Sequence, residues 1–575
     1  SNTDLYTGSF PADYGNAVGG VFDVRFRNGN TEKRAHSIQA GVLGVGIATE
    51  GPIGKSGNTS YLANYRYSTT GILSNFFPVG VVPIFQDLSF KIHHKGKNGE
   101  QVNVFGLGGI AFFRFFPELD TAVWDEVPGA NGGTNDTFRT FTVGASWQKP
   151  LSEDTYLKVM GVGTGLEVDQ RRWFQNRDLV TGDTTRRNYD FDGRLTFSAF
   201  INHRFNARHT HRSGLMVHGL YTNGYMRRSA ELLPNGDFSG LMDTLRVGQG
   251  TSTLFQAYSR SQFYLNEAWQ LNAGLHLMYF PYTGEVSLEP RMGVRWQLRP
   301  DHNLALSYGL HSQVEPLFAY VSRRPALGQG NALLTNDLRF NKAHHVTLGW
   351  FHQINARMRM GVEAYYQHHF NLVVGEDVPV SRMSGIDFLF ETFNLNNGGR
   401  GRNYGIEASL ERSFSQGYYF FANGSLFEAN YIGNDGIVRP SLYNAGLVSN
   451  IVGGKEWVVG QKKGKQNLLS VNLSATYSGP QRYTPLDLDA SIATGRFEYL
   501  YSEPNSSDQE ALFFLDASMV YKFNRPRSSS ELTIQLNNVL NQRPVLGELY
   551  DADNQEVDQN LGLGFFPLLS WRINF

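Results

Sequence analysis

Arginine and aromatic residues recur together along the chain in clusters that could bind an anion. A guanidinium group can pair with a carboxylate or a phosphate through two parallel hydrogen bonds, and a neighbouring aromatic ring offers a flat apolar surface. The same clusters could also form a solvated rim that binds nothing. The candidate residues are Arg171, Arg172, Trp173, Arg227, Arg228, Arg323, Arg324, Arg400, Arg402, Arg482 and Tyr483.

Other residues suggest a metal or phosphate site, but their spacing argues against it. His368 and His369 are adjacent, and neighbours on a strand point to opposite faces, so the pair cannot chelate one ion. The acidic stretch 551–560 lacks the glycine and the final acid that an EF-hand loop needs. The glycine-rich stretch 106–111 is not followed by a helix that would help to hold a phosphate. We therefore expect no metal site and no cofactor.

The composition argues against catalysis and against nucleic acid. No set of Ser, His and Asp and no pair of acids has the spacing of a catalytic motif, so we expect that the protein is not an enzyme. There is no Cys, which excludes thiol chemistry and disulfides. Lys and Arg number 51 and Asp and Glu number 52, and this balance gives no reason to expect nucleic acid as a partner.

A strict two-residue alternation indicates the elements that must position these side chains. The stretches 303–310, 358–372 and 469–478 each place apolar residues on one face and small or polar residues on the other. This is the pattern of a β-strand with two different faces. Aromatic residues make up 13% of the chain and Gly numbers 62, which favours a large all-β protein.

About 22 such strands are predicted along the chain. The lengths of the connections between them predict how they are arranged. Long connections such as 229–251 and 483–510 alternate with tight turns such as 299–302 and 354–357. Outer-membrane barrels have long extracellular loops and short periplasmic turns, and an even strand number leaves both chain ends in the periplasm. In hydrocarbon every backbone group must be paired internally, so the sheet must close. We predict a transmembrane antiparallel β-barrel in the outer membrane of a Gram-negative cell, with a lumen too wide for side chains to fill.

Near its start the chain has Tyr-Gly at 14–15 and Gly-Gly-Val at 19–21, and at its end Phe565, Leu569, Trp571, Ile573 and Phe575 lie on one face of a strand. Both ends resemble those of TonB-dependent outer-membrane transporters, and stretches 47–54 and 533–544 are similar to barrel segments of that family. The resemblance implies a short remnant of an N-terminal plug domain over residues 1–33 and a barrel over residues 34–575. In this family a final aromatic residue is read by the outer-membrane assembly machinery. The plug-end motif is carried by Tyr14, Gly15, Gly19, Gly20 and Val21, and the assembly signal by Trp571, Ile573 and Phe575.

The resemblance implies a receptor that imports a large or scarce nutrient through a plugged barrel. The nutrient would be of the siderophore, vitamin, oligosaccharide or peptide class. The implied partners are outer-membrane lipid, lipopolysaccharide, whose phosphates the basic clusters could contact, and the TonB complex, reached through a plug segment outside these residues. A surface lipoprotein or other envelope subunits could also bind. The alternative is a conduit or scaffold subunit of an outer-membrane assembly or secretion complex, without active transport.

Overall fold

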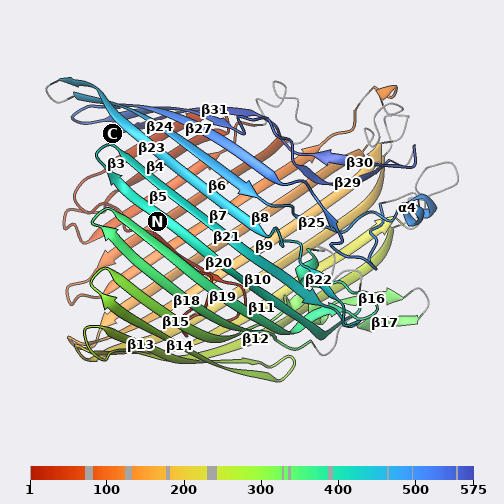
Figure 1. The fold of residues 1–575 in the computed structure, drawn as a ribbon, viewed down its shortest axis with the longest axis horizontal. Helices are drawn as coiled ribbons and strands as arrows, with labels where there is room; N and C mark the ends of the chain where they lie inside the picture. The colour runs from red at the N-terminus through yellow and green to blue at the C-terminus, as the bar shows by residue number, and fades with distance from the viewer. Residues whose placement is uncertain are drawn as a thin grey trace.

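Strands make up most of the molecule. The computed structural model describes residues 2–70, 82–118, 120–123, 132–175, 182–229, 242–326, 329–333, 338–385, 393–462, 465–494, 497–551 and 554–575. Within these residues, 22 antiparallel strands close into one barrel (Figure 1). The predicted fold class is confirmed.

The barrel strands follow one another around the wall in chain order. Each predicted strand corresponds to one of them, and several strands extend further toward the long loops than predicted. They are β3 (Ala35–Gly41), β4 (Gly44–Pro52), β5 (Thr59–Tyr67), β6 (Val82–Lys95), β7 (Gln101–Phe115), β8 (Gly132–Pro150), β9 (Thr155–Gln175), β10 (Gly182–Asn206), β11 (His209–Ser229), β12 (Met242–Tyr264), β13 (Trp269–Phe280), β14 (Glu285–Arg299), β15 (His302–Gln313), β18 (Asn341–Asn355), β19 (Met358–Gly375), β20 (Leu395–Ser415), β21 (Tyr418–Ile432), β23 (Leu447–Lys462), β24 (Lys465–Ser478), β27 (Leu512–Asn524), β28 (Ser529–Asn537) and β31 (Phe566–Asn574).

The barrel closes where its first strand meets its last. β3 pairs with β31 from Ser37 opposite Asn574 to Gly41 opposite Ser570. The backbone N–H of His36 donates to the carbonyl of Phe575 over 2.8 Å, and the N–H of Phe575 donates back over 2.9 Å. The C-terminal aromatic residue therefore lies at the closing seam, which leaves no open sheet edge there.

The two ends of the barrel differ as the connection lengths predict. One end carries tight turns, and the C-terminus lies there (Figure 1). Long connections with small elements of their own extend from the other end (Figure 1). These elements are α2 (Leu317–Val321), β16 (Arg323–Ala326), β17 (Gln329–Leu333), η3 (Arg382–Ser384), β22 (Val438–Pro440), β25 (Arg482–Tyr483), α4 (Leu488–Thr494), β26 (Ser507–Asp508), β29 (Val545–Asp551) and β30 (Glu556–Leu561).

The barrel wall is apolar outside and mostly polar inside. Leu195, Phe197 and Leu215 are 73%, 56% and 63% exposed on adjoining strands. Residues directly opposite on paired strands share a face, and successive residues alternate, so these side chains form a continuous outward surface. None of the helices in the described ranges has the length and hydrophobicity to cross a bilayer.

An apolar cluster of buried side chains lies at the long-loop end of the barrel. It includes Phe280, Tyr320 and Phe340, each at most 1% exposed. Helix α2 is part of it and lies against the inner wall of β12, where Gly248 leaves room. A Cβ atom at Gly248 would come within 2.9 Å of the Phe318 ring. The loops on this side are thus fixed to the wall.

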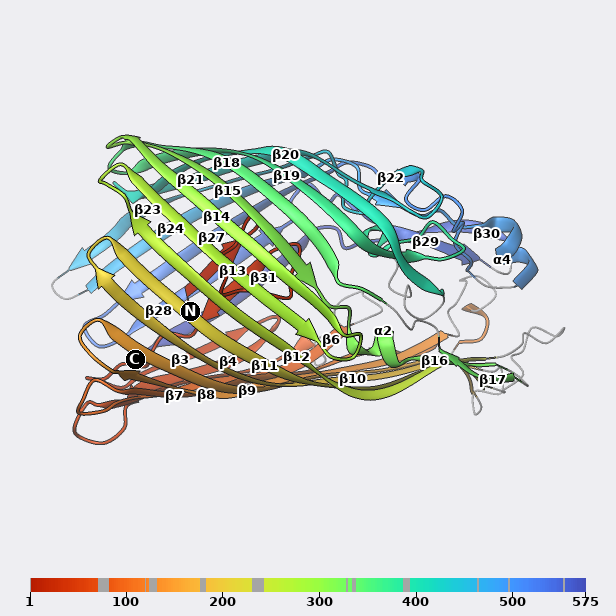
Figure 2. The same ribbon diagram turned by 90° about the horizontal axis from the view of Figure 1, so that it is seen from below.

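The N-terminal residues lie inside the barrel (Figure 2). β1 (Asn2–Tyr6) and β2 (Val21–Arg25) form a separate two-stranded ribbon, with Tyr6 opposite Val21. Between them, residues 7–16 run along the inner wall; we call this segment the strap.

Candidate functional site

Three Arg-Arg pairs lie side by side at the long-loop ends of β9, β10 and β11. In the strand register Arg172 lies opposite Arg186, and Arg186 lies opposite Arg228. Arg212, sixteen positions before Arg228 on β11, donates to Asp13 of the strap, so even-numbered residues of β11 face the lumen. Arg172, Arg186 and Arg228 therefore form one row on the lumen wall, which we call the inward row.

The other member of each pair faces away from the lumen. Arg171 lies opposite Arg187, and Arg187 lies opposite Arg227; we call these three the outward row. The guanidinium of Arg171 lies 5.7 Å from the Trp173 ring and that of Arg227 lies 4.9 Å from the Tyr225 ring. The row continues, toward the long-loop end, the outward face that carries the exposed apolar side chains of β10 and β11.

A loop with aromatic side chains contacts the inward row. The guanidinium of Arg228 lies 3.9 Å from the carboxylate of Glu498. Next to Glu498, the rings of Phe497 and Tyr499 lie 4.6 Å apart and those of Tyr499 and Tyr501 lie 5.7 Å apart. Burial, together with the negative charge of the nearby Glu498, raises the pKa of Tyr501 to about 12. Positive charge and flat, hydrogen-bonding rings thus meet at the outer mouth of the lumen.

The remaining predicted arginines lie elsewhere. Arg400 and Arg402 lie on the outward face of β20, the face that also carries the exposed Tyr404. Arg323 is exposed on β16, and the side chain of Arg324 lies outside the described part of the chain. Arg482 pairs with Asp508 over 2.9 Å and Tyr483 donates to Glu548 over 3.0 Å, both within the loops. The structure therefore brings only Arg172 and Arg228 of the predicted set together on the lumen wall.

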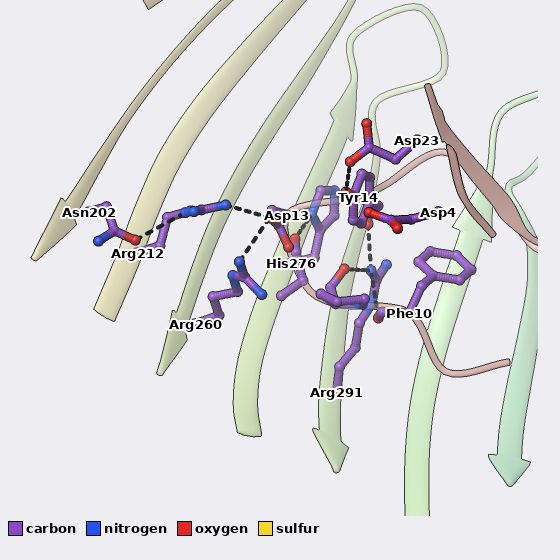
Figure 3. Close-up of polar contacts among 12 residues, drawn as sticks. Asp4, Phe10, Asp13, Tyr14, Asp23, Asn202, Arg212, Arg260, His276 and Arg291 are labelled. Carbon is purple, nitrogen blue, oxygen red and sulfur yellow. Dashed lines mark hydrogen bonds and ion pairs between the residues drawn. The ribbon is translucent and has the colours of Figure 1, made fainter. Parts of the chain in front are cut away.

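The strap is held against the barrel by side chains of the lumen wall (Figure 3). Arg291 on β14 donates to three strap carbonyls, those of Phe10, Pro11 and Tyr14, and the contact with Pro11 is 2.7 Å long. Nδ1 of His276 on β13 donates to the carbonyl of Ala12 over 2.7 Å. These carbonyls have no strand partner, so the wall supplies the hydrogen bonds that their burial requires.

Charged side chains also hold the strap against the wall. The carboxylate of Asp13 lies between Arg212 and Arg260, at 3.0 and 3.3 Å (Figure 3). Arg291 also pairs with Glu289 over 2.6 Å, and both side chains are at most 4% exposed. A buried arginine that binds both a carboxylate and several carbonyls is a strong local fixing point, because removing it leaves several groups unpaired.

The residues of the plug-end motif have different structural roles. The hydroxyl of Tyr14 donates to Asp23 of β2 over 2.7 Å and so joins the strap to the ribbon. Burial alone would raise the pKa of Asp23, but hydrogen bonds from Arg25 and Tyr14 hold it below its ordinary value. Gly15 lies so close to the wall that a Cβ atom would be 2.1 Å from Nε2 of His276, whereas one at Gly19 would meet nothing within 4 Å.

The structure confirms that the adjacent histidines on β19 point apart. His369 is buried on the lumen side, where Asn403 contacts it at 3.3 Å. His368 lies on the outer face, where its ring lies 6.2 Å from that of Phe370. The two rings cannot share one ion, as the sequence predicts.

Several residues of the wall were missed from the sequence. Arg186 belongs to a third Arg-Arg pair on a strand, a signal that could have placed it beside the other two. Arg291 and His276 carry no motif, because they are brought to the strap by strands more than 250 positions away. At the closing seam, Trp571 donates to Ser530 over 2.6 Å, and the role of Trp571, Ile573 and Phe575 in assembly stays a prediction.

Comparison with known proteins now identifies the class. The profile described as TonB dependent receptor-like, beta-barrel, matches residues 84–541. No curated protein matches the chain by sequence. The chain belongs to the family of TonB-dependent receptor barrels, which are outer-membrane proteins that import nutrients.

Solved structures share the fold at low sequence identity. FpvA of P. aeruginosa, bound to heterologous pyoverdines, has a TM-score of 0.72 and 12% identity, over 100% of this chain and 76% of that one. The ferric-catecholate import receptor Fiu of E. coli K12 has a TM-score of 0.70 and 14% identity, over 98% and 85%. BauA, the ferric preacinetobactin receptor of Acinetobacter baumannii, has a TM-score of 0.68 and 11% identity, over 100% and 85%.

Proposed function

We propose that this receptor imports an anionic nutrient of the siderophore class and that the inward row is its first binding surface. The observation that carries the proposal is the register of Arg172, Arg186 and Arg228 on the lumen wall at the outer mouth. Neighbouring strands lie about 4.8 Å apart, so the three guanidinium groups extend over about 10 Å. A compact ligand with several carboxylate or catecholate oxygens would match that width and charge.

The aromatic loop adds a second kind of contact. Phe393 packs against Tyr501 with ring centroids 5.1 Å apart, and Tyr499 continues the series. Such rings bind flat ligand groups through apolar surface and stacking. FpvA is bound to a ferric pyoverdine, Fiu is a ferric-catecholate import receptor and BauA is the ferric preacinetobactin receptor, and ferric siderophores are ligands of this chemistry. The protein would move this ligand without converting it.

We infer that residues 1–33 are the end of a plug domain and residues 34–575 the barrel. The ribbon exposes Leu5, Phe22 and Val24 at 54%, 71% and 58% inside the lumen. A two-stranded sheet with one uncovered apolar face is marginal alone, so further polypeptide would cover it. That plug body would carry the segment through which TonB opens the lumen, and ligand binding would favour exposure of that segment.

The outward row supports a different partner, the phosphates of lipopolysaccharide. Beside Arg171 and Trp173 lies a hollow of about 270 Å³, which Asn135 and Gln175 also line. Guanidinium groups above an apolar wall, with aromatic rings beside them, suit the phosphate-bearing headgroup of an outer-leaflet lipid.

Uptake by cells that contain this protein as their only receptor tests the proposal. A labelled ferric siderophore should enter with saturable kinetics, and entry should stop in cells that lack TonB. A panel of catecholate and carboxylate siderophores, with a neutral vitamin as control, would identify the class. Non-saturable entry that is independent of TonB would instead support the conduit alternative.

A further inference from the structure

Three metal-binding side chains meet at the short-turn end of the barrel. Asp301 lies in the turn between β14 and β15, His302 begins β15, and His352 lies directly opposite His302 on β18. One ligand atom from each residue lies within 4.8 Å of the other two. Even-numbered residues of β15 and β18 face outward here, so the cluster lies on the outer rim, near Trp350.

The carboxylate of Asp301 lies close to both imidazoles without a hydrogen bond to either, and Nδ1 of His352 donates instead to the carbonyl of Asp301 over 3.3 Å. Oδ2 of Asp301 lies 3.6 Å from Nε2 of His302 and 3.9 Å from Nδ1 of His352. A direct hydrogen bond would bring such atoms to about 2.7–3.2 Å. Ligands bound tetrahedrally at about 2.0–2.1 Å from zinc lie about 3.3 Å from one another. The two imidazole planes are nearly parallel, so one ring rotates out of the stack when both direct a ring nitrogen at one ion.

The backbone holds the three residues next to one another before an ion binds. The N–H of Gln353 donates to the carbonyl of Asp301 over 2.8 Å, which joins the turn to β18. The rings of His302 and His352 are stacked with centroids 4.0 Å apart, and each lies within 6 Å of the Trp350 ring. Two imidazoles and one carboxylate form a donor set that suits Zn²⁺ and other late first-row divalent ions.

We propose that Asp301, His302 and His352 bind one divalent transition ion, such as Zn²⁺, at the periplasmic rim. Water completes the coordination. The ion ties the β14–β15 turn to β18, and this role is separate from the import of ligand at the outer mouth.

Titration of the untagged, folded protein in detergent with Co²⁺ and Zn²⁺ tests this proposal. Co²⁺ should produce visible absorption bands of low-coordinate nitrogen and oxygen ligation at one equivalent, and Zn²⁺ should displace it. H352Q, and H302Q separately, should weaken binding about tenfold or more. Cu²⁺ at one equivalent should quench Trp350, and this quenching should be lost in W350F.

H209Q is the matched control. His209 also begins a strand at a short turn, and its ring stacks on that of Phe263 at 4.3 Å, but it belongs to no three-ligand cluster among the described residues. H209Q should bind Co²⁺ as the wild type does. Heat-induced unfolding monitors the fold of each variant. The proposal is wrong if H302Q/H352Q binds Co²⁺ as tightly as the wild type, or if the wild type gives no bands at millimolar Co²⁺.

Discussion

The inward and outward arginine rows have the same composition and lie on the same three strands, yet they face different surroundings. Arg172, Arg186 and Arg228 face the lumen, where Arg228 contacts a loop with aromatic residues. One position along each strand, the other member of each pair faces away from the lumen. Because residues alternate along a strand, we propose that the short sequence Arg-Arg binds a ligand on one side of the wall and a lipid on the other.

Removal of the inward row should have the largest effect. R172A/R228A would remove two guanidinium groups that face the lumen. Hydrogen bonds to charged groups contribute about 1.5–3 kcal/mol each, so ligand affinity should fall roughly 10- to 100-fold for each arginine that contacts the ligand. Equilibrium binding of the ferric siderophore to the purified receptor measures this. R171A/R227A, the neighbouring pair, should bind the ligand as the wild type does; equal losses in both variants would refute the division between the faces.

A second prediction concerns the wall residues that hold the strap on the lumen side. E289Q/R291M would remove the buried pair that holds three strap carbonyls. A spin label at G19C, where a Cβ meets no other atom within 4 Å, should then become clearly more mobile. R295M is the control, because Arg295 lies on the same strand and face and donates to Asn303 instead. An unchanged spectrum in E289Q/R291M would show that other contacts hold the strap.

Loss of the outward row should have the smallest effect. Exposed ion pairs contribute less than about 1 kcal/mol each. The amount of lipopolysaccharide that copurifies with R171A/R187A/R227A should therefore be only a few-fold lower than with the wild type. Quantitative phosphate analysis of lipid that copurifies with the receptor measures it. The inward variant R172A/R228A should keep the wild-type amount. An outward variant that keeps all its lipid would leave this row as a solvated rim.

The fold could be predicted from the sequence because the alternation of residues within each strand shows which side chains lie on each of its two faces. Stretches such as 303–310 and 469–478 alternate without interruption, and the lengths of the connections set the orientation. Alternation also separated His368 from His369 correctly. The same rule applied to Arg171 and Arg172 would have divided the arginine clusters between lumen and lipid, so that part of the site was available in the sequence.

Other contacts of the site could not be predicted from the sequence, because they depend on the register between distant strands. Arg291 meets Pro11 across 280 positions, and Arg228 meets Glu498 through a loop that folds back over the lumen. His302 and His352 became neighbours only through the pairing of β15 with β18. No local pattern records such contacts, whereas hydrophobic alternation is local and can be read directly.

Fluorescent labels at positions 171 and 172 would show whether the two arginine rows have different surroundings. The chain has no Cys, so R171C and R172C each give a single labelling site. In receptor reconstituted with lipopolysaccharide, saturating ferric siderophore should change the emission of a label at 172 and leave that at 171 unchanged. A lipid-soluble quencher should act on the label at 171 and spare the one at 172. If ligand and lipid quencher affect both labels equally, the two rows do not serve different faces, and the proposed binding surface is wrong.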